Sequence, residues 1–273
     1  MIKQLGCTTG SYSKFPFERA LQGIADAGLK YVEIAAVPIY CEHVKPEQMN
    51  KQQFKELKAM ISGYGIKPLS ISGHCNLATD GGAELFKKRI DFACELEVTI
   101  VNTSAGDIKT KEDEKRFFQN MESLSAYLKE RGITAALECH GGILGTAMEC
   151  RETVERIGSE HVKVNYDPAN GVFYEGVNPA DDIMDVVDYI AHVHIKDKLE
   201  GKGVWNFPAI GDGYIDFATL FDILYNNNYH GPFSFEIEFV RQGPKTPEEV
   251  DMALKKSINY LRQLKNDNWS ITI

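Results

Sequence analysis

Segments with the pattern of a strand and segments with the pattern of a helix alternate along the whole chain. The strand-like runs, rich in β-branched and aromatic residues, cover 2–7, 31–35, 66–72, 98–104, 133–138, 162–167, 189–196 and 233–239. The helix-like runs cover 16–28, 46–65, 82–96, 111–131, 148–157, 179–188, 216–227 and 247–265. Such alternation is typical of an α/β protein with a parallel sheet. Eight units predict a closed barrel, because no glycine-rich phosphate-binding turn follows the first strand as in doubly wound sheets.

The length of the chain agrees with this interpretation. Its 273 residues are close to the ~250 typical of an eight-fold barrel. No linker, low-complexity stretch or change of composition divides the sequence. We therefore predict that residues 1–273 form one domain, a single (β/α)8 TIM barrel.

Charge and cysteine usage limit the classes of partner. The net charge of −9 argues against a general affinity for nucleic acid or anionic membranes. The chain begins directly with a predicted strand, and it has no apolar stretch of membrane-spanning length. Its six cysteines are scattered without a CxxC pair, which indicates free thiols in a reducing compartment. We expect a cytoplasmic protein that binds neither nucleic acid nor membranes; a homo-oligomer remains possible.

Four residues suited to metal binding lie at the ends of four successive predicted strands. They are Glu138, Asp167, His194 and Glu236. Because the carboxyl ends of all strands of a parallel barrel meet at one face, these side chains can converge. Three carboxylates and one imidazole suit a hard or borderline divalent cation. The sequence predicts a site for one such ion: Mn²⁺, Mg²⁺, Co²⁺ or Zn²⁺.

The segments around these four residues resemble the xylose isomerase-like barrels of the sugar phosphate isomerase/epimerase family. The resemblance is carried by LECHGG (137–142), NYDPAN (165–170), HVHIKD (192–197) and the segment 211–239. It implies that the four residues hold the metal and that Glu138 and Glu236 are catalytic. Two carboxylates can remove a proton beside a carbonyl and return one, while a metal stabilises the enediolate. The implied function is a divalent-metal-dependent sugar isomerase or epimerase.

Further polar or aromatic residues lie near the ends of the predicted strands or in one of two irregular loops, 36–47 and 197–215. We expect them to contact the substrate, a small carbohydrate or polyol-derived molecule. They are Glu33, His74, His140, Asn170, Lys196 and Trp205. Glu33 and His74 could equally orient loops, and Lys196 could instead form a surface ion pair with Asp197. Glu238 is a rival of Glu236, since both are expected on one strand face. His192 is expected to be a packed, hydrogen-bonded barrel residue.

Two departures from the family pattern leave other activities open. Asn170 stands where many sugar epimerases have a histidine, and the loop after the seventh strand lacks an arginine found in ketose 3-epimerases. Asparagine donates a hydrogen bond but cannot act as a general acid or base. A dehydratase of an inosose-like or keto-sugar substrate, or a non-catalytic carbohydrate-binding barrel, therefore remains an alternative. The abasic-site endonucleases that share the barrel are disfavoured, because Asn170 replaces one of their metal-binding histidines.

Overall fold

Eight parallel strands close into a barrel in the computed structural model, which describes residues 3–264. The strands are β1 (Leu5–Thr8), β2 (Tyr31–Val37), β4 (Lys67–Ser72), β5 (Ile100–Thr103), β6 (Thr134–Glu138), β7 (Val162–Tyr166), β8 (Ile190–Ile195) and β10 (Phe233–Phe235). Closure comes from β1, which pairs with β10 on one side and with β2 on the other. The predicted (β/α)8 TIM barrel is confirmed. Two predicted ends, at residues 2 and 265, lie outside the described residues.

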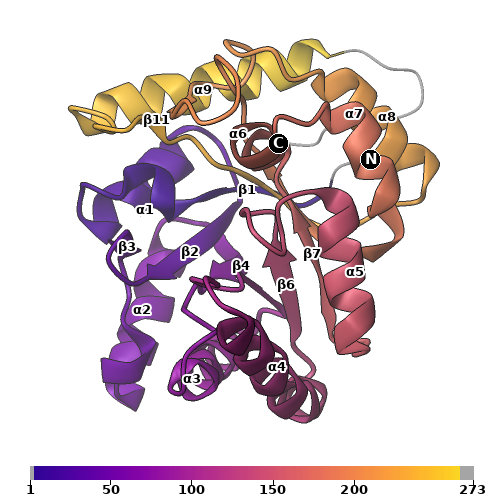
Figure 1. Cartoon of the computed structure of the whole chain (residues 1–273). Coiled ribbons are helices and arrows are strands. Elements are labelled where there is room, and N and C mark those ends of the chain that lie inside the picture. Colours follow the sequence, from indigo (N-terminus) through magenta and orange to yellow (C-terminus); the bar gives the residue numbers. More distant parts are fainter. Residues whose placement is uncertain (1–2, 265–273) are drawn as a thin grey trace.

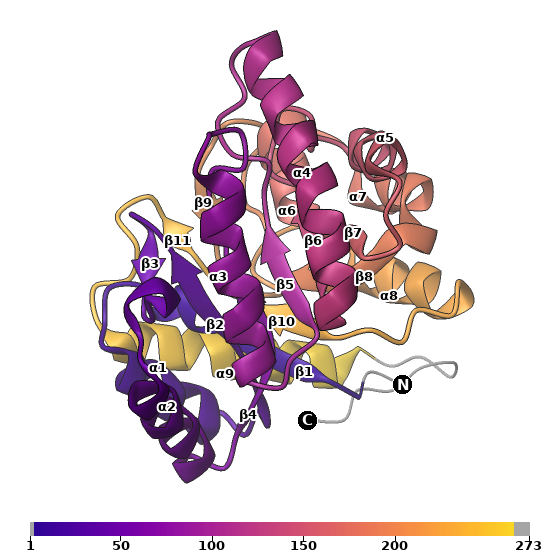
Figure 2. The ribbon, with the colours of Figure 1, turned by 90° about the horizontal axis from the view of Figure 1, so that it is seen from below.

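Helices surround the strands (Figure 1). They are α1 (Phe17–Asp26), α2 (Lys51–Gly63), α3 (Gly82–Glu95), α4 (Lys111–Arg131), α5 (Ala147–Ile157), α6 (Pro168–Glu175), α7 (Pro179–Asp182), α8 (Phe217–Asn226) and α9 (Pro247–Gln263). Figure 2 shows α3 and α4 side by side next to β5. Apolar residues such as Leu21, Ile24, Phe86 and Phe117 lie on these helices and are fully buried, which makes the layer between helices and strands the main core. Among residues 3–264, no helix combines the length and the apolar character that a membrane span requires.

Local capping fixes the ends of the helices. Thr110 accepts a hydrogen bond from the Asp113 amide and donates its own amide to the Asp113 carboxylate, so α4 begins where predicted. It ends at Gly132, whose φ of 63° is left-handed. α2 begins later than predicted, because Asn50 forms the capping box and Pro46–Gln48 form a separate 3₁₀ turn, η2. Each such cap stabilises the protein by about 1 kcal/mol.

The prediction of a continuous helix over 179–188 was wrong. One α-helical turn, α7, is followed by two 3₁₀ turns, η3 (Ile183–Asp185) and η4 (Val187–Tyr189). At the end of α7, the Asp182 carboxylate accepts hydrogen bonds from the Ala147 amide and the Tyr166 hydroxyl and so ties this turn to the barrel. Helix α6, directly after β7, was not predicted; Asp167 caps it and Pro168 occupies its first position.

The two irregular loops are partly ordered by short antiparallel pairs beyond the barrel strands. In the stretch 36–47, the end of β2 turns back to pair with β3 (Cys41–Glu42). In the stretch 197–215, β9 (Asn206–Phe207) pairs with β11 (Phe239–Val240), which follows β10 (Figure 2). β10 itself ends at Phe235, four residues earlier than predicted. These pairs hold loop residues over the carboxyl ends of the strands.

Candidate active site

The structure brings together the four residues with metal-ligand chemistry. Glu138 ends β6, Asp167 follows β7, His194 lies in β8 and Glu236 follows β10, so they come from four neighbouring strands of the barrel. One ligand atom from each lies within 4.8 Å of all the others. His194 Nδ1 is 3.3 Å from Glu236 Oε2, 3.7 Å from Glu138 Oε2 and 3.8 Å from Asp167 Oδ2. The parallel order of the strands, and no local motif, produces this convergence.

The fit of this cluster to a cation can be tested at Asp167. Its side chain is completely buried, and its Oδ1 accepts the Asn170 amide that begins α6. Its Oδ2 has no hydrogen-bond partner among residues 3–264, and the Lys196 ammonium lies 3.6 Å from it, beyond hydrogen-bond distance. A buried carboxylate oxygen without a donor is costly unless a positive charge faces it. Three clustered carboxylates and one imidazole therefore fit a hard or borderline divalent cation.

The charges around the cluster keep its two glutamates ionised. Burial alone would raise the pKa of Glu236, but Lys196 and His194 outweigh it and lower that pKa to about 2. For Glu138, burial is likewise outweighed by His194 and His74, which hold its pKa well below the usual range. Burial would lower the pKa of His194, yet the surrounding carboxylates raise it well above its ordinary value. The negative potential that favours a proton on this imidazole would also attract a metal cation.

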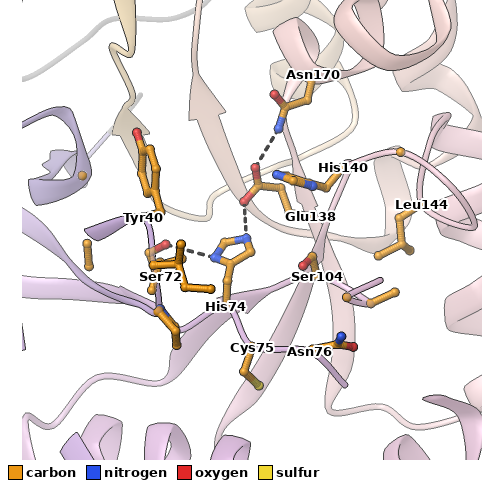
Figure 3. A pocket seen from close by; sticks show the side chains of 18 of the residues that line it. Tyr40, Ser72, His74, Cys75, Asn76, Ser104, Glu138, His140, Leu144 and Asn170 are labelled. Atoms are coloured by element: carbon orange, nitrogen blue, oxygen red, sulfur yellow. Dashed lines mark hydrogen bonds and ion pairs between the residues drawn. The ribbon is translucent and has the colours of Figure 1, made fainter. Parts of the chain in front are cut away.

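Glu138 is held from both of its oxygens at the floor of a cavity of about 780 Å³. His74 Nε2 lies 2.9 Å from Glu138 Oε2, and Asn170 Nδ2 donates to Glu138 Oε1 at 2.8 Å. Ser72 in turn contacts His74 Nδ1 at 3.1 Å, and Figure 3 shows this chain of contacts running from Ser72 to Asn170. Such contacts leave the Glu138 carboxylate little freedom to turn.

Lys196 lies inside the cavity, and the alternative of a surface pair with Asp197 was wrong. Its side chain is only 3% exposed, and its ammonium is 2.7 Å from Glu238, 3.1 Å from Glu236 and 3.2 Å from Asn170 Oδ1. Burial would lower the pKa of Lys196, but these carboxylates raise it well above its ordinary value. Asp197 instead accepts backbone amides of the loop that follows, including that of Gly211.

Five of the six predicted substrate contacts line the cavity, namely His74, His140, Asn170, Lys196 and Trp205. His140 contacts the Tyr174 hydroxyl at 3.3 Å, and Trp205 packs edge-on against Phe173. Glu33 is the exception. It is fully buried, does not line the cavity, and lies 3.1 Å from His194 Nε2 inside the barrel. A substrate contact by Glu33 is therefore not supported.

One residue at the cavity, Tyr40, makes a contact that was not predicted from the sequence. It lies at the turn between β2 and β3, lines the cavity (Figure 3) and donates to Glu238 Oε1 at 2.8 Å. Glu238 belongs to the Lys196 contacts and not to the four-residue cluster, which contains Glu236. The irregularity of 36–47 pointed to a cavity loop, but nothing in it singled out Tyr40. His192 is packed and hydrogen-bonded to Asn165 and Ser234, as expected.

Comparison with known proteins finds two kinds of relative, inosose dehydratases and sugar 3-epimerases. An inosose dehydratase of Clostridium perfringens is 27% identical over 175 residues, covering 58% of this chain and 57% of that protein. The chain thus spans little more than half the length of that relative. A D-psicose 3-epimerase of Enterocloster bolteae is 22% identical over 251 residues, covering 86% of this chain and 80% of that protein.

The solved structures share the fold. D-Allulose 3-epimerase from Methylomonas sp. in complex with D-allulose has a TM-score of 0.73 and 20% sequence identity, covering 96% of this chain and 97% of that one. At this identity the likeness concerns the fold alone. The model of the family described as xylose isomerase-like TIM barrel matches residues 21–264, most of the chain. The resemblance inferred from four short segments is thereby confirmed, and this chain belongs to the xylose isomerase-like TIM barrel family.

Proposed function

We propose that this protein is a divalent-metal-dependent isomerase or epimerase that removes a proton from the carbon beside a carbonyl of an uncharged sugar or polyol-derived ketone. One observation carries the proposal: the ligand atoms of Glu138, Asp167, His194 and Glu236 cluster within 4.8 Å, and two of these residues line an open cavity. Sugar epimerases among the relatives support it.

The proposed roles divide between holding the ion and moving the proton. Glu138, Asp167, His194 and Glu236 would hold the cation, which when bound supplies the Lewis acidity that polarises a carbonyl and stabilises negative charge beside it. Glu138 and Glu236 are ionised and therefore able to accept a proton. His74 and Asn170 orient the Glu138 carboxylate, whereas Lys196 orients that of Glu236. One carboxylate would remove the proton from the carbon beside the carbonyl. Return of a proton to the former carbonyl carbon gives isomerisation, whereas return to the opposite face of the first carbon gives epimerisation.

The charge of the cavity favours an uncharged substrate. Glu138, Glu236 and Glu238 line it with Lys196, and Asp167 lies just beneath. The lysine is already paired with Glu236 and Glu238. Lys196 is the only lysine or arginine among the described residues that line the cavity. A phosphate or carboxylate on the substrate would therefore be repelled.

Dehydration is a second candidate, favoured by the position of Lys196. Its ammonium lines the cavity beside Glu236, where it can donate a proton to a hydroxyl group on the carbon next to the deprotonated one. The C–H bond would break at a carboxylate, a C=C bond would form, and the hydroxyl would leave as water. Inosose dehydratases among the relatives support this alternative.

Hydrogen exchange in D₂O tests the shared first step. Metal-loaded protein is incubated with ketoses, aldoses and inososes, each beside its phosphorylated counterpart where one exists, and followed by proton NMR. We expect loss of the proton beside the carbonyl in an unphosphorylated compound, with an isomer or epimer formed; a new enone absorbance would identify the dehydratase instead. Binding of metal and sugar without any exchange would refute the proposal and indicate a carbohydrate-binding barrel.

A further inference from the structure

Glu33 lies beneath the cluster and contacts its histidine. The side chain projects from β2 into the barrel and is completely buried. Its Oε1 is 3.1 Å and its Oε2 3.3 Å from His194 Nε2, across the barrel in β8. Ser70 of β4 donates to Oε2 at 3.0 Å, which fixes the carboxylate from the other side. Glu33 is therefore positioned to act on His194 without reaching the cavity.

The two ring nitrogens of His194 face different surroundings. Nε2 faces Glu33, while Nδ1 faces the carboxylates of Glu138, Asp167 and Glu236 at 3.3–3.8 Å. Both nitrogens face carboxylates, which only accept hydrogen bonds, so each can carry a hydrogen while no cation is bound. A cation in the cluster would take the place of the hydrogen at Nδ1, and the hydrogen left on Nε2 would be donated to Glu33.

The neighbouring His192 does not share this arrangement. It also approaches Glu33, with Nε2 at 3.2 Å from Oε2, but that nitrogen lies 3.1 Å from the Ser234 hydroxyl as well. Its Nδ1 is bound to Asn165 Oδ1 at 2.9 Å and so is turned away from the four-residue cluster. The group formed by Glu33, His192 and His194 is thus a hydrogen-bonded layer under the site.

We propose that Glu33 is a positioning residue for the metal site: it fixes His194 in the form with hydrogen on Nε2, so that Nδ1 is the nitrogen that binds the ion. This inference rests on the proposed metal site. Partners of this kind hold ligating histidines in many metalloproteins, and their loss typically weakens metal binding about 10- to 100-fold. It gives Glu33, predicted as a substrate contact, a role on His194, which does not line the cavity.

Metal titration of three variants tests the proposal. Glu33→Met keeps the length of the side chain but has no oxygen to accept from Nε2, and we expect Zn²⁺ and Co²⁺ affinity to fall about 10- to 100-fold. Glu33→Gln keeps one acceptor oxygen, and its loss should be smaller. Asn102→Ser is the matched control, because Asn102 is equally buried in the same layer but contacts His192 and neither Glu33 nor His194. It should bind metal within about 2-fold of wild type.

Nitrogen-15 NMR of the Zn²⁺-loaded wild type decides the question even where a variant does not fold. With the His194 signals identified by their absence in His194→Gln, we expect zinc on Nδ1 and hydrogen on Nε2. Zinc on Nε2, or a Glu33→Met protein that binds metal as wild type does, would overturn the role of Glu33 alone. A wild type that binds no divalent metal would instead refute the metal site, and the proposed function with it.

Discussion

Glu138→Gln is expected to lower the rate of substrate hydrogen exchange about 10²- to 10⁴-fold, the usual contribution of a general base. The amide has the shape of the carboxylate; its one oxygen can still accept from Asn170 Nδ2 while its NH₂ group faces His74 Nε2, so the cavity should keep its form. It cannot accept the substrate proton, because a neutral amide is not a base near neutral pH. The rate is measured in D₂O at a metal concentration that saturates the variant, which separates lost basicity from weaker metal binding.

The matched control is Glu175→Gln, the same chemical change at the end of α6, where the carboxylate pairs with Lys202 at the surface. This variant should exchange hydrogen at the wild-type rate. A metal-saturated Glu138→Gln protein that stays within about 3-fold of wild type would remove Glu138 from the proton transfer and leave Glu236 as the candidate base.

Asp167→Asn should separate metal binding from folding. The amide oxygen can still accept the Asn170 amide and begin α6, so the local structure should persist. Burial, and then repulsion by the carboxylates of Glu138 and Glu236, raise the pKa of Asp167. The substitution removes this buried negative charge. We expect the metal-free variant to melt at or above the wild-type temperature while metal affinity falls by at least about 100-fold.

Calorimetric titration with Mn²⁺ or Co²⁺ gives the metal affinity, and thermal unfolding of the metal-free protein gives the melting temperature. Lys196 keeps its contacts with Glu236 and Glu238 in the variant, so it is not left as an unpaired buried charge. Unchanged metal affinity would exclude Asp167 as a ligand. A large fall in the melting temperature would instead give this carboxylate a structural role.

The sequence sufficed for the barrel and for the convergence of the four cluster residues because both follow from general rules. Alternating patterns indicate parallel strands, and parallel strands bring their carboxyl ends to one face. Glu138, Asp167, His194 and Glu236 needed only their places at strand ends to be brought together. Their role as metal ligands stays a prediction.

These rules could not predict how deep a side chain lies inside the barrel. Alternation tells which face of a strand a residue occupies, but not how far it lies from the mouth. Glu33 thus looked like a substrate contact, although it lies in the layer below the cavity. Tyr40 reaches Glu238 only through a turn whose geometry no sequence pattern specified. The contact of Asp182 with Tyr166 at the end of α7 joins two segments, and the pattern of neither one indicates it.

The metal content of the purified protein tests the central claim most directly. Elemental mass spectrometry of wild type beside Glu236→Gln should find about one divalent ion per chain in the wild type and a lower content in the variant. The substitution replaces one of the three clustered carboxylates with an uncharged amide, a weaker ligand for a divalent cation, which is why the contents should differ. A wild type without bound metal, even after incubation with Mn²⁺, Co²⁺ or Zn²⁺, would contradict the four-residue metal site and the proton abstraction built on it.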